Sequence, residues 1–221
     1  MIKLCVFDCD GTLVDSGAAI MASMCAAFAA HDLPLPTDDA VRRVVGLSLS
    51  EAIACLLPTV TAQRCKRVSE SYREAVAAMH CERALLEPLY PGVMEGLQAL
   101  EDQGWCLGLA TGKSRRGAMA TLSAHGLTHR FVTLQTPDNA AGKPSPQMML
   151  QAMAEVGADP GATVMVGDTT YDMMMARNAG TLAVAVTWGY HRQHELEASG
   201  AHAVVDEFAA IAPAVDGLIN Q

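Results

Sequence analysis

The residues most able to do chemistry in this chain follow predicted strands. The apolar run Ile2–Phe7 indicates a buried strand, and it ends in two carboxylates, Asp8 and Asp10. Later predicted strands are followed in the same way by polar or charged residues: Thr111, Lys143, Asp168 and Asp172. Because the carboxyl ends of parallel strands share one edge of a sheet, we expect these side chains to converge there. Any one of them alone is also compatible with an ordinary polar loop.

The expected cluster contains four carboxylates, and their mutual repulsion limits what the site can be. Two like charges ~4 Å apart cost about 4 kcal/mol at an effective dielectric constant of about 20. The cluster therefore needs a cation, and its oxygen donors favour Mg²⁺, which binds carboxylates, waters and phosphate oxygens. Lys143 would add a second positive charge, and Pro144 disfavours a helical conformation at that lysine. This combination is typical of phosphoryl transfer.

A carboxylate is the nucleophile that the sequence favours. The chain has no Gly-x-x-x-x-Gly-Lys-Ser/Thr motif, which excludes a P-loop. None of its seven cysteines is followed by arginine six residues later, so a cysteine-based phosphatase loop is absent as well. Asp8 is the candidate nucleophile of a two-step reaction through an aspartyl-phosphate. Asp10 is placed to protonate the leaving oxygen and then to deprotonate the attacking water.

The elements that must position these residues change character along the chain. Residues 15–87 predict helices only, including one from Ala18 to Ala30, one capped by Ser50 and one capped by Thr61. Beyond them, strands alternate with helices of about ten residues, which indicates βαβ units and a parallel sheet. The later strands are predicted at Trp105–Ala110, Phe131–Leu134, Thr163–Val166, Leu182–Val186 and Ala203–Val205.

The predicted fold class is therefore α/β. We expect a Rossmann-like parallel sheet core with helices on both faces and an inserted all-helical cap domain. The core would comprise residues 1–14 and 88–221, and the cap residues 15–87.

The composition indicates which kinds of partner and which cellular compartment to expect. The 221 residues carry a net charge of −9, with an isoelectric point near 5.1 and no dense basic patch, so a nucleic-acid partner is not expected. The cysteines include no Cys-x-x-Cys pair, which favours reduced, mostly buried thiols over disulfides. No apolar run reaches the roughly 18 residues of a membrane span. We expect a soluble, cytoplasmic protein that does not bind membranes.

Four ordered motifs resemble the signature motifs of the haloacid dehalogenase-like hydrolase superfamily. They are Asp8-Cys9-Asp10-Gly11-Thr12, Thr111, Gly142-Lys143-Pro144-Ser145-Pro146 and Gly167-Asp168-x-x-x-Asp172. The helical insertion after the first motif is similar to the type-1 cap of that superfamily. Two further stretches resemble its phosphoglycolate phosphatase branch: Val45-Gly46-Leu47-Ser48 and Val186-Thr187-Trp188-Gly189-Tyr190.

This resemblance implies specific roles for the strand-end residues. The catalytic residues would be Asp8, Asp10, Thr111 and Lys143. The phosphate-binding residues would be Thr111, the Gly112 amide and Lys143. The Mg²⁺ ligands would be Asp8, Asp10 through its main-chain carbonyl, Asp168 and Asp172. The chain departs from the family pattern at Gly112, where Asn or Ser is common, and at Gln147, where Asp is common.

The function that follows is a Mg²⁺-dependent phosphatase acting on a small phosphorylated metabolite, either phosphoglycolate-like or a sugar phosphate. Two alternatives stay open: a phosphomutase of the β-phosphoglucomutase type, and a non-catalytic binding module that retains the fold. Candidates for contacts with the leaving group are Arg42 and Arg43 in the cap, one of Arg115 and Arg116, and His191. The substrate itself and the oligomeric state are not determined by the sequence.

Overall fold

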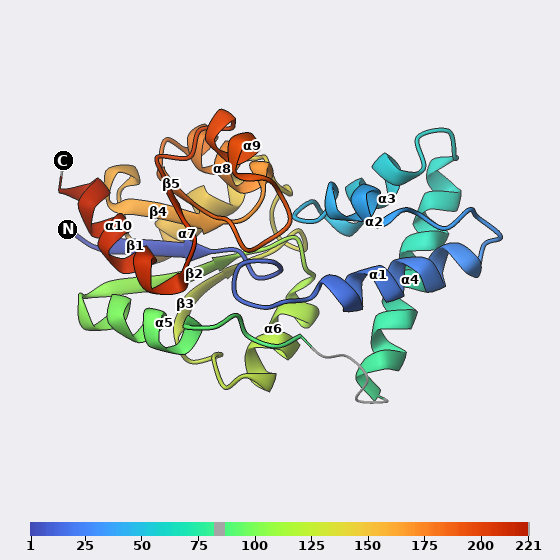
Figure 1. The fold of residues 1–221 in the computed structure, drawn as a ribbon, viewed down its shortest axis with the longest axis horizontal. Coiled ribbons are helices and arrows are strands. Elements are labelled where there is room, and N and C mark those ends of the chain that lie inside the picture. The colour runs from blue at the N-terminus through green and yellow to red at the C-terminus, as the bar shows by residue number, and fades with distance from the viewer. Residues whose placement is uncertain (82–86, 221) are drawn as a thin grey trace.

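A parallel sheet of six strands forms the centre of the part of the chain that the computed structural model describes, residues 1–81 and 87–220. The strands are β1 (Lys3–Phe7), β2 (Trp105–Ala110), β3 (Phe131–Gln135), β4 (Thr163–Gly167), β5 (Leu182–Val186) and β6 (Ala203–Val205). Their order is β3-β2-β1-β4-β5-β6, and every neighbouring pair is parallel. β1, the strand that ends at Asp8, is therefore central, between β2 and β4 (Figure 1).

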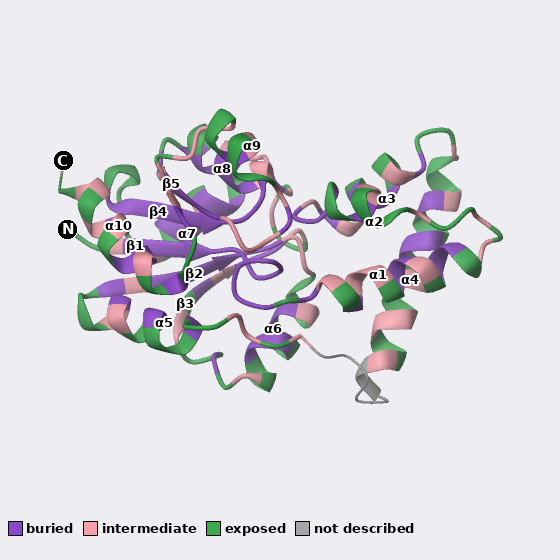
Figure 2. Ribbon diagram, in the orientation of Figure 1, coloured by how far each residue is buried: buried purple, intermediate pink, exposed green. Residues whose placement is uncertain are grey.

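Helices cover both faces of this sheet, as the predicted fold class requires. They are α5 (Val93–Asp102), α6 (Arg115–Ala124), α7 (Gln147–Val156), α8 (Thr170–Ala179), α9 (Gln193–Ala198) and α10 (Ile211–Ile219), with 3₁₀ turns at Pro160–Ala162 and Phe208–Ala210. Successive side chains of a strand point to opposite faces. Accordingly, Cys5 and Phe7 pack with α5, α6 and α10, whereas Leu4 and Val6 pack with α7, α8 and α9. Figure 2 shows the strands buried between these two layers.

A separate helical block lies beside the sheet, between β1 and α5 in the chain. Its helices are α1 (Gly17–Ala29), α2 (Asp38–Arg42), α3 (Leu49–Leu56) and α4 (Ala62–Cys81). They bury a core of their own around Met24, Phe28, Ile53 and Val68. We call this block the cap, as in the sequence-based prediction. Residues 82–86 of the predicted cap domain lie outside the described residues.

One predicted helix start in the cap is wrong by two residues. Ser48, not Ser50, caps α3, because the Ser48 hydroxyl accepts the main-chain N–H of Glu51 while the Glu51 carboxylate accepts the N–H of Ser48. This reciprocal arrangement is a capping box, which satisfies two donors at the helix start. The pair also fixes the loop between α2 and α3, and that loop lies over the sheet.

Candidate active site

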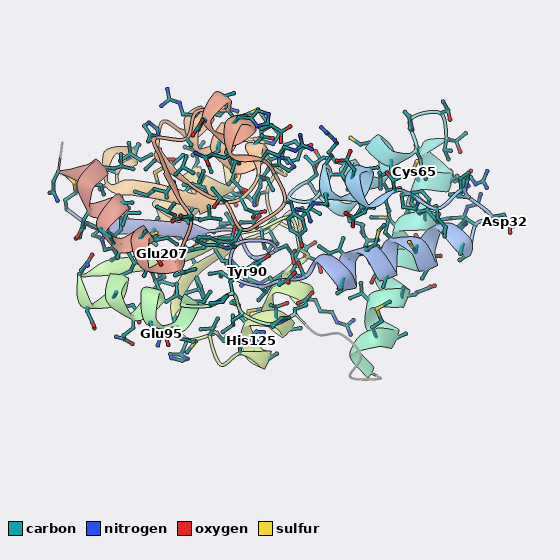
Figure 3. The ribbon with its side chains drawn as sticks, in the orientation of Figure 1. Asp32, Cys65, Tyr90, Glu95, His125 and Glu207 are labelled. Carbon is teal, nitrogen blue, oxygen red and sulfur yellow. The ribbon has the colours of Figure 1, made fainter. Side chains whose placement is uncertain are left out.

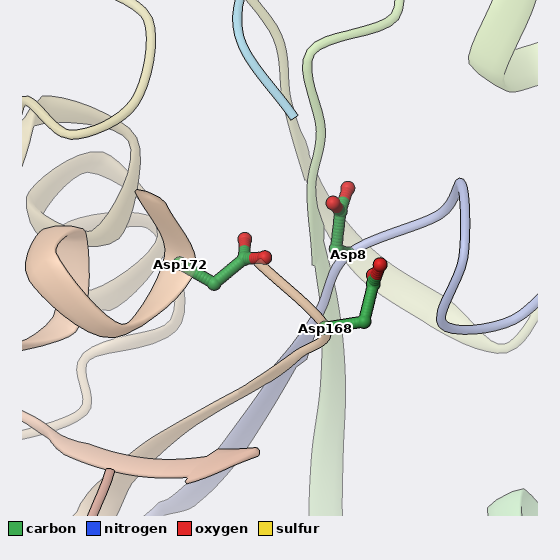
Figure 4. A group of neighbouring side chains, drawn as sticks. All are labelled: Asp8, Asp168 and Asp172. Carbon is green, nitrogen blue, oxygen red and sulfur yellow. The ribbon is translucent and has the colours of Figure 1, made fainter. Parts of the chain in front are cut away.

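The carboxyl ends of β1 and β4 bring three carboxylates together. Asp8 directly follows β1, Asp168 follows β4, and Asp172 lies in the first turn of α8. Each contributes one oxygen to a group in which the oxygens lie within 4.8 Å of one another, and all three residues are buried (Figure 4). The convergence predicted from the strand ends is thus present for these three acids.

Lys143 supplies the positive charge inside this group. It lies in the loop after β3, its side chain is fully buried, and its Nζ is 2.8 Å from Asp8 Oδ2 and 2.6 Å from Asp172 Oδ1. Burial alone would lower the pKa of Lys143, but the carboxylates of Asp172 and Asp8 raise it overall, so the ammonium stays charged.

Hydrogen bonds from the surrounding loops hold the other two carboxylates in place. The Thr12 hydroxyl donates to Asp168 Oδ1 at 2.7 Å, and the Tyr190 amide donates to Asp168 Oδ2 at 2.9 Å. Asp172 Oδ2 accepts from both the amide and the hydroxyl of Thr169, in a second capping box at the start of α8. Sequence reasoning assigned no role to Thr12 or Thr169, although Thr12 lies two residues after Asp10 and Thr169 directly follows Asp168.

Asp10 lies apart from this three-carboxylate group. Its Oδ1 pairs instead with Lys113 Nζ at 2.9 Å, and the same ammonium is 2.9 Å from Glu87 Oε1. Glu87 is fixed in turn by α6: the Thr121 hydroxyl donates to its Oε2 at 2.8 Å. His125 (Figure 3) donates through Nε2 to the Glu87 main-chain oxygen at 2.7 Å. The predicted acid/base and the predicted nucleophile therefore have different cationic partners, Lys113 for Asp10 and Lys143 for Asp8.

Lys113 and Glu87 were not identified from the sequence. Lys113 stands two residues after Thr111, so its position in the motif was a usable signal. Glu87 carried no such signal, because only the return of the chain from the cap brings it to the end of β2. The role predicted for the main-chain carbonyl of Asp10 toward a metal stays a prediction.

Two of the three acids, Asp8 and Asp168, hold protons more tightly than free carboxyl groups do. Burial raises the pKa of Asp8 to about 7 even though Lys143 opposes the shift. Burial, together with the charges of Asp8 and Asp172, also raises the pKa of Asp168 well above its usual range. One lysine is therefore not enough to stabilise the fully ionised group, and a further cation would be bound favourably there.

The donor set suits Mg²⁺. The buried atoms Asp8 Oδ2 and Asp172 Oδ1 lie within ion-pair distance of Lys143, but their contacts lack hydrogen-bond alignment, so both oxygens keep lone pairs without a donor. Carboxylate oxygens in a compact group are the ligands that Mg²⁺ prefers. Asp8, Asp168 and Asp172 would hold the ion, and it would supply the charge that balances them.

Thr111 and Gly112 lie where the cap approaches the end of β2. Thr111 is fully buried, and its hydroxyl accepts the main-chain N–H of Lys113 at 3.2 Å. A Cβ on Gly112 would clash with the main-chain oxygen of Leu47 in the cap. The close approach explains why glycine stands here, where the sequence comparison with the family expects Asn or Ser.

A cavity of about 650 Å³ opens above Asp8, between the cap and the sheet. Asp8, Asp10, Thr111, Gly112 and Lys113 line its base. Its other walls come from α1, the loop before α3, α4 and the first turns of α6. Of the predicted site residues, Asp168, Asp172 and Lys143 lie behind this base rather than in the wall.

The structure does not support leaving-group contacts by the cap arginines that the sequence suggested. Arg42 donates to the main-chain oxygen of Gly189 at 3.1 Å, and Arg43 pairs with Asp39 at 3.0 Å. His191 accepts the Thr170 amide through Nδ1 at 3.0 Å, and its buried Nε2 has no hydrogen-bond partner within the described residues. None of the three lines the cavity above Asp8. Arg42 instead joins the cap to the loop after β5, and Arg43 pairs with a residue of the cap itself.

Comparison with known proteins agrees with this geometry. The family model for haloacid dehalogenase-like hydrolases matches residues 5–186. The chain belongs to this family. Within the described residues of this hydrolase, helices that combine the length and the apolar character of a membrane span are absent.

Two curated relatives and one crystal structure show how close the similarity is. A probable phosphatase from Dickeya dadantii (strain 3937) is 38% identical over 225 residues, which cover 100% of this chain and 96% of the relative. A phosphoglycolate phosphatase from Agrobacterium fabrum is 31% identical over 218 residues, which cover 96% of this chain and 91% of the relative. The crystal structure of a hydrolase from Pseudomonas syringae has a TM-score of 0.85 at 26% identity, covering 97% of this chain and 98% of that one.

These comparisons confirm the predicted superfamily and its phosphoglycolate phosphatase-like branch. They also confirm the fold class and the enzyme class, a phosphoric monoester hydrolase. They do not assign roles to individual residues of this hydrolase.

Proposed function

We propose that this hydrolase is a Mg²⁺-dependent phosphatase that cleaves a small phosphate monoester through an Asp8-phosphate intermediate. The observation that carries the proposal is the position of Asp8. This buried carboxylate ends the central strand, lies 2.8 Å from Lys143 Nζ, shares an acidic group with Asp168 and Asp172, and faces the cavity. We propose phosphoglycolate-like compounds, as in the name of the relative from Agrobacterium fabrum, and sugar phosphates as the substrate classes.

The first step makes one bond and breaks another at phosphorus. An oxygen of Asp8 attacks the phosphorus atom, and the bond between phosphorus and the leaving oxygen breaks. Asp10 gives its proton to that leaving oxygen, which departs as an alcohol. Thr111 and the Gly112 amide hold phosphate oxygens, and Lys143 offsets the negative charge of Asp8 and of the phosphoryl group. When bound, Mg²⁺ supplies further positive charge against the phosphate oxygens.

The second step restores the enzyme. Asp10, now ionised, takes a proton from a water molecule as that water attacks phosphorus, and the bond to Asp8 breaks to release inorganic phosphate. The pair formed by Lys113 and Glu87 holds Asp10 at the cavity side of the site, where both the leaving group and the water arrive. We also propose that residues 15–87 act as a lid that opens for exchange and closes to exclude bulk water.

Two substitutions separate the roles of the first two aspartates. Asp8→Asn should abolish phosphate release from p-nitrophenyl phosphate while the protein stays folded, because the nucleophile is lost without a change of shape. Asp10→Asn should retain the nucleophile and slow the second step, so that intact-mass measurement during turnover shows the added mass of one phosphoryl group. Near-normal release by Asp8→Asn would contradict the mechanism.

A phosphate-release screen over phosphorylated metabolites then identifies the substrate. The same reactions, followed for conversion of one sugar phosphate into its isomer, test the phosphomutase alternative. Hydrolysis of no ester in the panel would instead favour a binding module.

A further inference from the structure

The cavity above Asp8 is larger than a two-carbon leaving group requires. Its volume of about 650 Å³ falls within the range of about 300–1,000 Å³ found for pockets that hold drug-sized ligands. Its cap side is largely apolar, with Ile20, Met24, Val45, Leu49 and Val76 among the lining residues. Such a wall would bury an apolar portion of a leaving group.

Two arginines line the same cavity from different domains. Arg73 belongs to α4 of the cap, and Arg116 belongs to the first turn of α6 in the core. Both side chains are on the exposed side of the wall, so they lie away from the buried acids at its base. The two arginines therefore line one cavity, one from the cap and one from the core.

Neither arginine forms an ion pair with another side chain of residues 1–79 and 87–220. Among the residues that line this cavity, Lys113 pairs with Asp10 and Glu87, and Asp8 pairs with Lys143 behind the base. Arg73 and Arg116 take part in none of these ion pairs. The one further acid in the wall, Asp138, accepts the main-chain N–H of Arg115 at 2.7 Å. Positive charge thus remains at the cavity wall of a chain whose net charge is −9.

Guanidinium groups bind carboxylates and phosphates with paired, charge-assisted hydrogen bonds. We propose that Arg73 and Arg116 form a second anion subsite. The substrate would then be a phosphate monoester whose leaving group has an apolar portion and a carboxylate or second phosphate of its own. This inference rests on the proposed phosphatase activity. An anion held by both arginines would also join cap to core, and would favour the closed lid.

Matched substrates test the subsite directly. We would measure kcat/KM for alkyl phosphates of increasing chain length that end in a hydroxyl, a carboxylate or a second phosphate. At the chain length that spans the cavity, a charged end should raise kcat/KM roughly tenfold or more over the hydroxyl end. The carboxylate and phosphate arms show which anion the subsite takes.

Variants then assign the preference to these two residues. Arg73→Gln and Arg116→Gln should each reduce the ratio of charged to hydroxyl substrate by about tenfold, mainly through KM. If both hold one anion, the loss in the double variant should be smaller than the sum of the single losses. The matched controls are Arg67→Gln on α4 and Arg115→Gln on α6, which remove the same charge from the same helices. Arg67 does not line the cavity, and Arg115 donates to the Leu134 oxygen.

The outcomes separate the two proposals. Phosphate release without any preference for a charged end, or equal loss of the preference in the control variants, would overturn the subsite and leave the phosphatase intact. Absence of phosphate release from every ester, p-nitrophenyl phosphate included, would overturn both. A preference retained by the controls and reduced by the two cavity variants would support the subsite.

Discussion

At the scale of single residues, Lys143 has the most demanding environment. A fully buried ammonium lies between two buried carboxylates, and a third carboxylate completes the group. Loss of one partner of a buried ion pair leaves an uncompensated charge, which costs far more than loss of an exposed pair. Lys143 therefore contributes to stability as well as to phosphate binding.

Lys143→Met should lower the free energy of unfolding by about 3 kcal/mol, because the acidic group loses its internal cation. Urea unfolding in the presence of a chelator measures the change, and added Mg²⁺ should restore part of it. Lys66→Met, at an exposed position on α4, serves as the control with little expected effect. Equal stability of the two variants would show that Lys143 is not needed to balance the acids.

The raised pKa of Asp8 predicts how the stability of the protein and the effect of Mg²⁺ on it depend on pH. In the folded protein this pKa is about 7, above the ordinary value of 3.8, so the folded state holds the proton over a range in which the unfolded chain has released it. The stability of the metal-free protein should therefore fall as pH rises between about 4 and about 7. Mg²⁺ must compete with that proton, so its stabilising effect should grow over the same range.

Thermal unfolding with and without Mg²⁺ tests whether the stabilising effect of the metal increases with pH. The increase in Tm on adding Mg²⁺ should be larger at about pH 8 than at about pH 5. Asp8→Asn should reduce the difference, since it removes the titrating group. A larger metal effect at the acidic end would contradict the assignment.

At the scale of elements, the loop between α2 and α3 packs directly against the core. Two glycines allow the cap and the core to approach each other here. A Cβ on Gly46 of the cap would lie 2.8 Å from the Thr169 hydroxyl of the core, and a Cβ on Gly112 of the core would meet the Leu47 main-chain oxygen of the cap. Contact with a main-chain atom cannot be relieved by a side-chain rotation. The loop can therefore lie this close to the strand ends only because residue 112 is glycine.

Gly112→Ala should push the loop away from β2 and reduce kcat/KM for the preferred substrate at least tenfold, because the closed site can no longer form. The Tm should change little, since each domain keeps its own core. Gly161→Ala is the matched control, as no atom lies within 4 Å of the Cβ that it adds. Unchanged kinetics of Gly112→Ala would show that the observed approach is not needed for turnover.

At the scale of the whole molecule, the cap and the sheet have separate apolar cores. The cap core is built around Phe28 and Ile53, and the two sheet cores lie on either face of β1. Both tryptophans of the chain, Trp105 and Trp188, belong to the sheet side. The two parts should therefore respond independently when one core is damaged, as expected for an inserted domain.

Phe28→Ala tests this independence. Deleting a buried aromatic ring should destabilise the cap by about 3–5 kcal/mol. The helical signal in circular dichroism should then show an early transition, while tryptophan fluorescence should report unfolding of the sheet near its original midpoint. Coincident transitions would mean that cap and core unfold as one unit, against the predicted domain division.

Much of the site followed from local sequence patterns. A buried strand ends where apolar residues give way to Asp and Gly, so Asp8, Thr111 and Asp168 could be placed at strand ends without coordinates. Parallel topology then required those ends to meet. The start of α3 was misplaced for an equally local reason: two serines stand close together, and only the reciprocal bond with Glu51 shows which of them is the cap.

The sequence by itself determined the family, the fold class and the convergence of three of the four acids, because these depend on hydrophobic periodicity and on short motifs. Only the tertiary structure decided which cations face which acids. Lys113 meets Glu87 across the return from the cap, Arg42 turns to the loop after β5, and Arg73 and Arg116 share the cavity. These choices depend on how two domains pack, and the direction of a long side chain at their boundary is not encoded in its immediate neighbours.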